Sequence, residues 1–223
     1  VDYFVANSSF VAARIHTYYR RKSTVIFPPV ETDDFLPLDK HEDFYLLAGE
    51  LVPYKRADLA IEAFNASGRK LVVVGAGEMR KALEKAAGPN IQFVGRIPFK
   101  DLKARFASCK ALVFPGEEDF GIVPVEVMAR GRPDVDYGRG GALDTVIPDA
   151  TGVLFDRQTV ESLNGAIDRL ERSDLLRSCR QIRGHAEGFD RKVFCERFSA
   201  FVQNAYNEKQ EGIRAMRDLA LGA

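Results

Sequence analysis

The sequence is short of the residues from which metal centres and nucleophilic sites are usually built. It has three cysteines, Cys109, Cys179 and Cys195, and three histidines, and neither set has metal-ligand spacing. The odd number of cysteines and their scattered positions favour reduced structural thiols in a cytoplasmic protein over a disulfide framework. Because Cys109 precedes a buried strand, packing explains it better than catalysis. We therefore expect no metal site.

The chain also lacks a charge excess and a long apolar run. Its 32 basic residues balance 32 acidic ones, so no overall field favours nucleic acid as a partner. No apolar run approaches the ~20 residues of a membrane-spanning helix, and the first residues do not resemble a signal peptide. The composition predicts a globular cytoplasmic protein in which any anion site is local.

What the sequence does contain is a regular alternation of buried strands and amphipathic helices. Runs that are apolar on both faces, such as FYLLAG, KLVVVG and ALVFP, alternate with helical patterns. This alternation predicts an α/β fold with a doubly wound, Rossmann-like parallel sheet, covered by helices on both faces. After Phe155 the chain becomes helical. We expect a strand, a helix and a strand within residues 1–27, and helices at 55–66, 78–87, 99–108, 121–130, 159–173, 174–186 and 190–221.

The segment EEDFGIVPVEVMARG, residues 117–131, follows a predicted buried strand and enters a helix. Ligands of doubly wound sheets bind beyond the carboxyl ends of the strands, where this segment is expected to lie. Free amides near Gly121 would favour an anion. Glu118 and Glu126 are eight positions apart, so both carboxylates could accept hydrogen bonds from one extended ligand. Acidic residues that only stabilise a helix start are the alternative.

A second segment, AGELVPYKRADLAIEAF at residues 48–64, carries two cations where a helix begins. A strand ends at Gly49, and Lys55 and Arg56 follow. Two cations in this position could bind a diphosphate and stabilise it as a leaving group. The alternative is a solvated basic pair without a ligand.

Taken in order and at these spacings, the segments resemble the C-terminal donor domain of family 4 retaining glycosyltransferases, which have the two-domain GT-B fold. The resemblance covers roughly residues 1–205 and is strongest to bacterial mannosyltransferase-like members that build lipid-linked polysaccharides. The matching segments are ANSSFVAARI, VIFPPVETDDF, LVPYKRADLAIEAF, VVVGAGEMRKALEKAA, IQFVGRIPFKDLKARFASCKALVFPGEEDFGIVPVEVMA and YGRGGALDTVIPDATGVLF.

The resemblance implies roles for the matched residues. Glu118 would contact the donor sugar and Glu126 the ribose, because both match the family's motif of two glutamates separated by seven residues. Lys55 would bind the diphosphate, with Arg56 as a weaker candidate beside it. The other implied donor-binding residues are Gly49 at the strand end, the amides of Gly121, Ile122 and Val123, and Arg96, Gly75 and Gly77 near the nucleoside.

The resemblance also implies a division of the chain and an activity. Residues 1–186 would form the nucleotide-sugar-binding domain, and helices over 187–223 would cross to an N-terminal acceptor domain that precedes Val1 in the family. The whole enzyme would transfer a hexose with retention, from a nucleotide diphosphate sugar to a saccharide or lipid-linked acceptor, at the inner face of the membrane. GDP-mannose is the favoured donor, with UDP-glucose next, and no cofactor is expected. Residues exposed for self-association would be Phe198, Phe201, Val202, Tyr206 and Leu219.

Two departures from the family pattern stand out. Glu50 occupies a position where many members carry an arginine that binds phosphate. Asp134 and Asp136 replace apolar residues of a buried strand, where unpaired carboxylates are costly. They imitate the Asp-x-Asp metal motif of another glycosyltransferase fold, but a local change or a salt link to Arg130 or Arg132 explains them better.

Other functions remain open at this stage. Gly75-Ala76-Gly77 after a strand imitates a nicotinamide-binding turn, but Arg80 stands where the third glycine would be. A nucleotide-sugar-binding module without transfer activity and a nucleotide-sugar epimerase are the two alternatives. Product analysis separates them, because an epimerase releases an altered free sugar without an acceptor.

Overall fold

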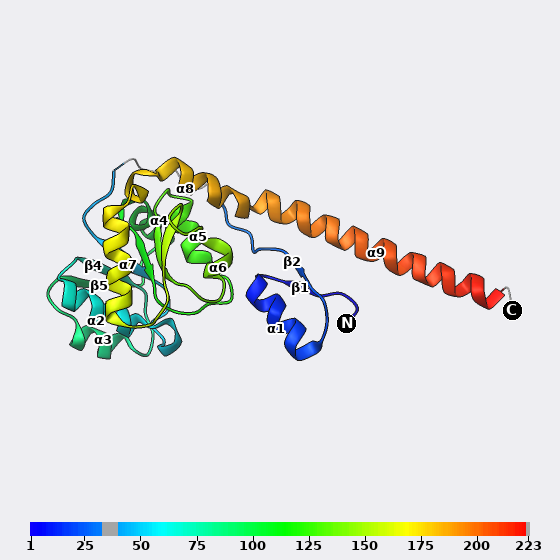
Figure 1. Cartoon of the computed structure of the whole chain (residues 1–223), viewed down its shortest axis with the longest axis horizontal. Helices are drawn as coiled ribbons and strands as arrows, with labels where there is room; N and C mark the ends of the chain where they lie inside the picture. The colour runs from blue at the N-terminus through cyan, green and yellow to red at the C-terminus, as the bar shows by residue number, and fades with distance from the viewer. Residues whose placement is uncertain (33–39, 222–223) are drawn as a thin grey trace.

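The computed structural model describes the backbone over residues 1–32 and 40–221, and the side chains of these residues up to residue 213 (Figure 1). The end of the VIFPPVETDDF match and the side chain of Leu219 therefore lie outside the described residues.

A parallel sheet of six strands forms the centre of the molecule, as predicted. Its order is β5-β4-β3-β6-β7-β8, so the chain winds outward first on one side of β3 and then on the other. The reversal falls between β3 and β6, which is where ligands of doubly wound sheets bind. The strands are β3 (Tyr45–Ala48), β4 (Leu71–Val74), β5 (Ile91–Gly95), β6 (Leu112–Phe114), β7 (Asp134–Tyr137) and β8 (Gly152–Phe155).

Helices cover both faces of this sheet, and each face has its own core (Figure 1). On one face α2 (Ala57–Ser67), α3 (Arg80–Ala86) and α7 (Val160–Arg172) pack through residues such as Phe64, Leu83 and Ile167. On the other, α4 (Phe99–Ser108), α5 (Ile122–Met128) and α8 (Cys179–Ala186) pack through residues such as Phe106, Val127 and Ile182. The double covering explains why the strands are apolar on both faces.

Helix α5 is shorter than the predicted helix 121–130. Gly131 adopts a positive φ of 74°, and Pro133 follows it. The helix therefore ends before residue 130, although the helical sequence pattern continues to that residue. The predicted helix 174–186 is likewise divided into η2 (Leu175–Arg177) and α8.

The first strands form a separate unit. Strands β1 (Val5–Ala6) and β2 (Thr24–Val25) pair in parallel with each other and form a two-stranded sheet apart from the large one. Between them α1 (Ser9–Tyr19) begins where Ser8 Oγ accepts a hydrogen bond from the Val11 amide at 3.1 Å. The predicted domain of residues 1–186 therefore contains two sheets, and its boundary stays a prediction.

The chain ends in a long helix, as predicted. After η3 (Glu187–Phe189), α9 (Arg191–Leu221) runs away from the sheet and past the β1–β2 unit (Figure 1). Asp190 caps its start, because its carboxylate accepts from the Lys192 amide at 2.8 Å. The same carboxylate accepts from the Thr32 hydroxyl at 2.5 Å and so ties the start of α9 to the chain that leaves β2.

Candidate functional site

The loops after the two central strands bring Lys55 and Glu118 together. Lys55 ends the 3-10 turn η1 (Pro53–Lys55) after β3, and Glu118 lies in the loop after β6. Their Nζ and Oε1 atoms are 3.1 Å apart, and the side chains are 25% and 22% exposed. The pair offers a ligand a cation and a hydrogen-bond acceptor side by side, at the point where the strand order reverses.

Arg56 does not share this position. It adopts a left-handed conformation with φ of 55°, and its guanidinium bonds Asp58 at 3.2 Å and the Gln158 side chain at 3.0 Å. Gln158 in turn donates to the Pro115 carbonyl at 2.8 Å. Arg56 therefore links the start of α2 to the chain before α7, whereas Lys55 faces Glu118.

Glu126 lies on α5, one helix turn beyond Gly121, and is half-buried. Burial raises the pKa of its carboxyl to about 7, and the charge of Lys103 only partly opposes this. Gly121 caps the helix in a left-handed conformation, and Ile122 and Val123 form its first turn. The predicted residues of this segment are thus gathered on the loop and helix that follow β6.

A pocket of about 450 Å³ opens at the carboxyl ends of β3, β4 and β5. It brings together four predicted residues, Gly49, Gly75, Arg96 and Val123, and adds Glu50. A Cβ on Gly75 would lie 1.8 Å from the Gly49 carbonyl oxygen, so the two loops meet backbone to backbone. Gly77 packs instead against the backbone of Leu51 and does not line this pocket.

Two glycines that were not predicted as site residues support the loop of Glu118. The Gly141 amide donates to the Glu118 carbonyl at 2.8 Å, and a Cβ on Gly140 would lie 2.3 Å from that oxygen. Both glycines follow β7 and precede the short helix α6 (Ala142–Thr145). The adjacent glycines of YGRGG were the available signal, because paired glycines favour close backbone approach.

The β1–β2 unit also reaches this region. Arg14 on α1 pairs with Asp119, the neighbour of Glu118, at 2.8 Å. The Ser9 amide donates to Asp144 on α6 at 2.7 Å. Both contacts join segments more than 100 residues apart, so no local pattern could predict them.

Asp134 and Asp136 are buried in β7, and Asp136 borders a narrow hollow that Glu118 also lines. They are 0% and 1% exposed, and within the described part of the chain none of their carboxyl oxygens has a hydrogen-bond partner. Burial raises both pKa values well above the usual range, and the pKa of Asp134 is raised further by Asp136. Arg132 donates to the Ala107 and Lys40 carbonyls. Over the residues described, no three acidic, histidine or cysteine side chains gather as a metal site would require.

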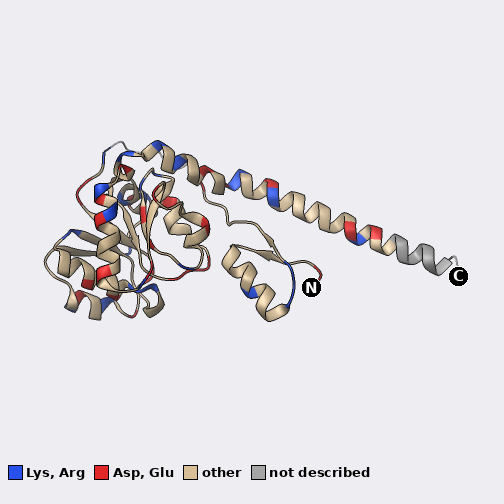
Figure 2. Ribbon diagram, viewed as in Figure 1, with Lys and Arg blue, Asp and Glu red and all other residues tan. Residues whose placement is uncertain are grey.

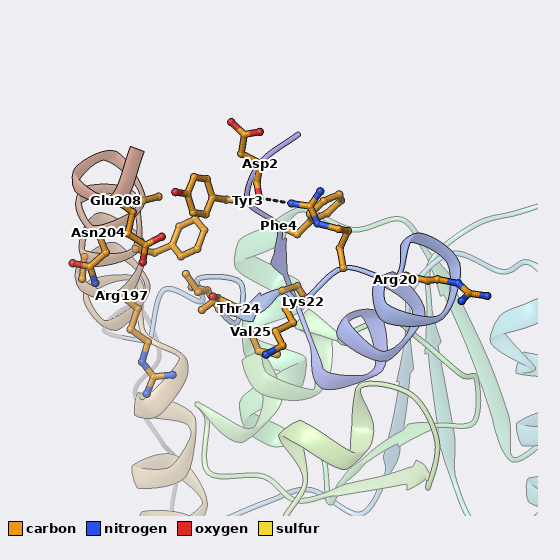
Figure 3. Close-up of a pocket in the computed structure, with 16 residues that line it drawn as sticks. Asp2, Tyr3, Phe4, Arg20, Lys22, Thr24, Val25, Arg197, Asn204 and Glu208 are labelled. Carbon is orange, nitrogen blue, oxygen red and sulfur yellow. Dashed lines mark hydrogen bonds between the residues drawn. The ribbon is translucent and has the colours of Figure 1, made fainter. Parts of the chain in front are cut away.

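A larger hollow lies away from all of these residues. It has about 1060 Å³ between the β1–β2 unit and α9, and charged residues such as Arg20, Lys22, Arg197 and Glu208 line it (Figure 3). Arg21 also lines it and donates to the Asp2 carbonyl at 2.6 Å. The described residues that line this hollow include none of the predicted site residues.

Basic and acidic residues are interspersed over the sheet domain and along α9 (Figure 2). Among the residues that the structure describes, no helix combines the length and the apolarity needed to cross a bilayer.

Comparisons with known proteins find glycosyltransferases similar to this chain. The chain is 26% identical over 212 residues to an uncharacterized glycosyltransferase of Methanocaldococcus jannaschii, covering 93% of this chain and 60% of the relative. It is 31% identical over 147 residues to a GDP-mannose-dependent alpha-mannosyltransferase of Mycolicibacterium smegmatis, covering 64% of this chain and 39% of that protein. Anabaena HepE, solved in complex with UDP and glucose, superposes with a TM-score of 0.78 at 17% identity, over 91% of this chain and 63% of HepE.

The chain thus spans less than two thirds of the length of each of these proteins. A family model described as "Glycosyl transferases group 1" matches residues 31–187, which is more than half of the chain and includes Lys55, Glu118 and Glu126. The chain belongs to the group 1 glycosyltransferases and has the α/β fold of a GT-B domain.

Proposed function

We propose that this chain is the donor-binding half of a retaining glycosyltransferase. The enzyme transfers a hexose, with mannose as the favoured sugar, to a saccharide or lipid-linked acceptor. The observation that carries the proposal is the Lys55–Glu118 pair beside the pocket at the ends of β3, β4 and β5. A nucleotide diphosphate sugar needs a cation for its phosphates, acceptors for its hydroxyls and an apolar pocket for its base, and these lie together here.

Each residue has a part in this function. The Lys55 ammonium stabilises the diphosphate as it departs, with the amides of Gly121, Ile122 and Val123 beside it. Glu118 accepts hydrogen bonds from sugar hydroxyls and positions the anomeric carbon, while Glu126 holds the ribose. The acceptor then attacks from the face that the diphosphate leaves, so configuration is retained without a carboxylate nucleophile of the glycosidase kind. The nucleoside lies between Gly49, Gly75 and Arg96.

The comparisons support a nucleotide-sugar donor. One relative is named as GDP-mannose-dependent, and HepE was solved with UDP and glucose. We assign residues 1–186 to donor binding and the helices of 187–223 to contact with an acceptor domain, in the cytoplasm at the inner membrane face. The extra length of the relatives is consistent with such a domain.

Metal-free binding of a nucleoside diphosphate tests the proposal. Titration calorimetry with GDP and UDP in the presence of a chelator should give a dissociation constant on the order of 0.1–1 mM, or about 4–5.5 kcal/mol. Binding of neither nucleotide, or binding only with added magnesium or manganese, would contradict the proposed site.

Two matched variants test the roles of the glutamates. Glu126→Gln should lower the affinity for the bare nucleoside diphosphate and for the nucleotide sugar alike, because the ribose is common to both. Glu118→Gln should lower mainly the affinity for the nucleotide sugar. If Glu118→Gln harms the bare diphosphate as much as the sugar donor, the assignment of Glu118 to the sugar is wrong.

A further inference from the structure

We propose that Glu50 makes the donor site selective for guanine, an inference that rests on the proposed function. The pocket at the ends of β3, β4 and β5 has one carboxylate, Glu50, and one guanidinium, Arg96. Its remaining wall is glycine, alanine and the aliphatic side chains of Val74, Ile97, Leu102 and Val123. An apolar slot with two opposite charges suits a flat base that carries both donors and acceptors.

Both charged groups are available to a ligand. Glu50 and Arg96 are exposed, and in the part of the chain that the structure describes neither side chain takes part in an ion pair or hydrogen bond. The neighbouring Arg56 is engaged, by contrast, because its guanidinium pairs with Asp58. A base that enters the pocket therefore meets one free acceptor group and one free donor group.

Guanine complements this pair better than uracil or adenine does. Its N1–H and N2–H₂ groups stand side by side and can donate to both oxygens of one carboxylate, while O6 and N7 accept from a guanidinium. Uracil has a single N–H between two carbonyls, so a carboxylate that accepts its proton also faces a carbonyl oxygen. Adenine has an acceptor, N1, where guanine has a donor. Charge-assisted, two-point contacts of this kind are the strongest hydrogen bonds available to a base.

The position of Glu50 also argues against a phosphate-binding role. Gly49 precedes it, and a Cβ on Gly49 would lie 3.9 Å from the Lys55 ammonium, so the proposed phosphate ligand lies close to this strand end. A carboxylate repels phosphate and must instead receive N–H or O–H donors from the nucleoside. The base edge and the ribose hydroxyls are the two sources of such donors, and the experiment separates them.

The test compares four diphosphates on the 223-residue chain and on Glu50→Gln by titration calorimetry. IDP, inosine diphosphate, differs from GDP only in lacking the N2 amino group of the base. The third ligand, 2′-deoxy-GDP, lacks one ribose hydroxyl, and the fourth, UDP, has a different base. We expect the parent chain to prefer GDP over IDP and UDP by roughly tenfold or more, the size of one charged hydrogen bond. In Glu50→Gln, the affinity for GDP should exceed the affinity for IDP by only roughly threefold or less. Glu78→Gln, which removes an equal charge from a nearby exposed position outside the pocket, should keep the ratio.

Equal affinities of GDP and IDP for the parent chain would overturn the assignment. A Glu50→Gln loss that is the same for GDP, IDP and UDP but vanishes for 2′-deoxy-GDP would also overturn it, because Glu50 would then bind the ribose. Binding of all four nucleotides without discrimination refutes only the guanine assignment. Binding of none refutes the donor site itself, and the guanine assignment with it.

Discussion

Burial places the pKa of Glu126 within the physiological pH range, so the protonation of this carboxyl can control donor binding. Its pKa is about 7, and the proposed ribose contact needs the carboxylate as an acceptor. A ligand that binds only the ionised form loses affinity as the pH falls through this pKa. Nucleoside diphosphate affinity should therefore drop about tenfold between about pH 8 and about pH 6.

The Glu126→Gln variant isolates this effect. The terminal phosphate also titrates near pH 6 in this range, but it does so with both proteins. The difference between the two pH profiles, measured by calorimetry, reports Glu126 alone. Identical profiles for the parent and the variant would show that the nucleotide does not depend on this carboxylate.

Lys55 and Arg56 are adjacent cations with different surroundings, so their variants should differ. Lys55→Met should weaken diphosphate binding by about 1.5–3 kcal/mol, the contribution of a charged hydrogen bond. Arg56→Met should cost less than about 1 kcal/mol, because its guanidinium is engaged by Asp58 and Gln158. Methionine keeps the apolar stem in both variants. Melting temperatures serve as the control, and equal losses of affinity would remove Lys55 from its assigned role.

The residues of the proposed site could be predicted from the sequence more readily than the partners that the structure gives them. Two glutamates on one segment and a lysine after a strand could be found from spacing, and the structure brings Lys55 and Glu118 to 3.1 Å. The direction of Arg56 could not be found, because it depends on a positive φ and on Gln158, 102 residues away. The contact of Gly140 and Gly141 with Glu118 could not be predicted for a similar reason, since it depends on the packing of two loops.

At the scale of elements, β7 is the least favourable strand of the sheet. Strand β6 pairs with β7 from Asp134 to Asp136, and β8 pairs with it from Asp134 to Tyr137. Even so, β7 buries the carboxyls of Asp134 and Asp136 without hydrogen-bond partners in the described chain. Both pKa values are raised far above 3.8, so the folded protein retains protons that the unfolded chain releases. This destabilisation is absent below about pH 4 and grows as the pH rises above it.

Valine at both positions should therefore stabilise the fold. Removing two unsatisfied buried carboxyls should raise the free energy of unfolding by about 2–6 kcal/mol near neutral pH, at about 1–3 kcal/mol for each. The gain should be larger at about pH 8 than at about pH 5, because over this range the folded parent holds protons that the unfolded chain has already released. Urea unfolding at both pH values measures it.

Glu62→Gln, at an exposed position on α2, is the matched control and should give no comparable gain. A double variant that unfolds at the same urea concentration as the parent, at both pH values, would show that the two carboxyls are satisfied in solution. A loss of stability would assign them a structural role.

Element types followed from local patterns, while element boundaries and pairings did not. The apolar strands and the alternating helices were readable because a parallel sheet buries both of its faces. The end of α5 depends on the positive φ of Gly131, which the helical pattern of its neighbours masks. The pairing of β1 with β2, apart from the large sheet, is a choice of partner that no short segment encodes.

At the scale of the whole molecule, the β1–β2 unit is attached to the sheet domain by few contacts. Besides the chain through residues 27–32, described contacts include the Arg14–Asp119 pair, with both side chains 53% exposed, and the Ser9–Asp144 hydrogen bond. Exposed ion pairs contribute about 0–1 kcal/mol. On the other side of the unit, Tyr3 meets Phe201 edge to face and Asp2 pairs with Lys209, so α9 is its second support.

These contacts leave an apolar stripe of α9 uncovered. Phe198, Val202 and Tyr206 are spaced four residues apart, which puts them on one face, and they are 39%, 50% and 60% exposed. An apolar stripe on a long projecting helix is a surface for helix pairing. We therefore expect the 223-residue chain to self-associate through α9, with a mass that rises with concentration in sedimentation velocity experiments.

A charge in the middle of the stripe should prevent this association. Val202→Glu places a carboxylate where two helices would meet, and burying it unpaired opposes contact, so the dissociation constant should rise by about tenfold or more. Gln203→Glu adds the same charge at the next exposed position, where Gln203 bonds Asn207, and should leave association nearly unchanged. A parent chain that sediments as a monomer at every concentration would refute the contact. Equal weakening by the two variants would mean that overall charge, and not the Phe198–Tyr206 stripe, controls association.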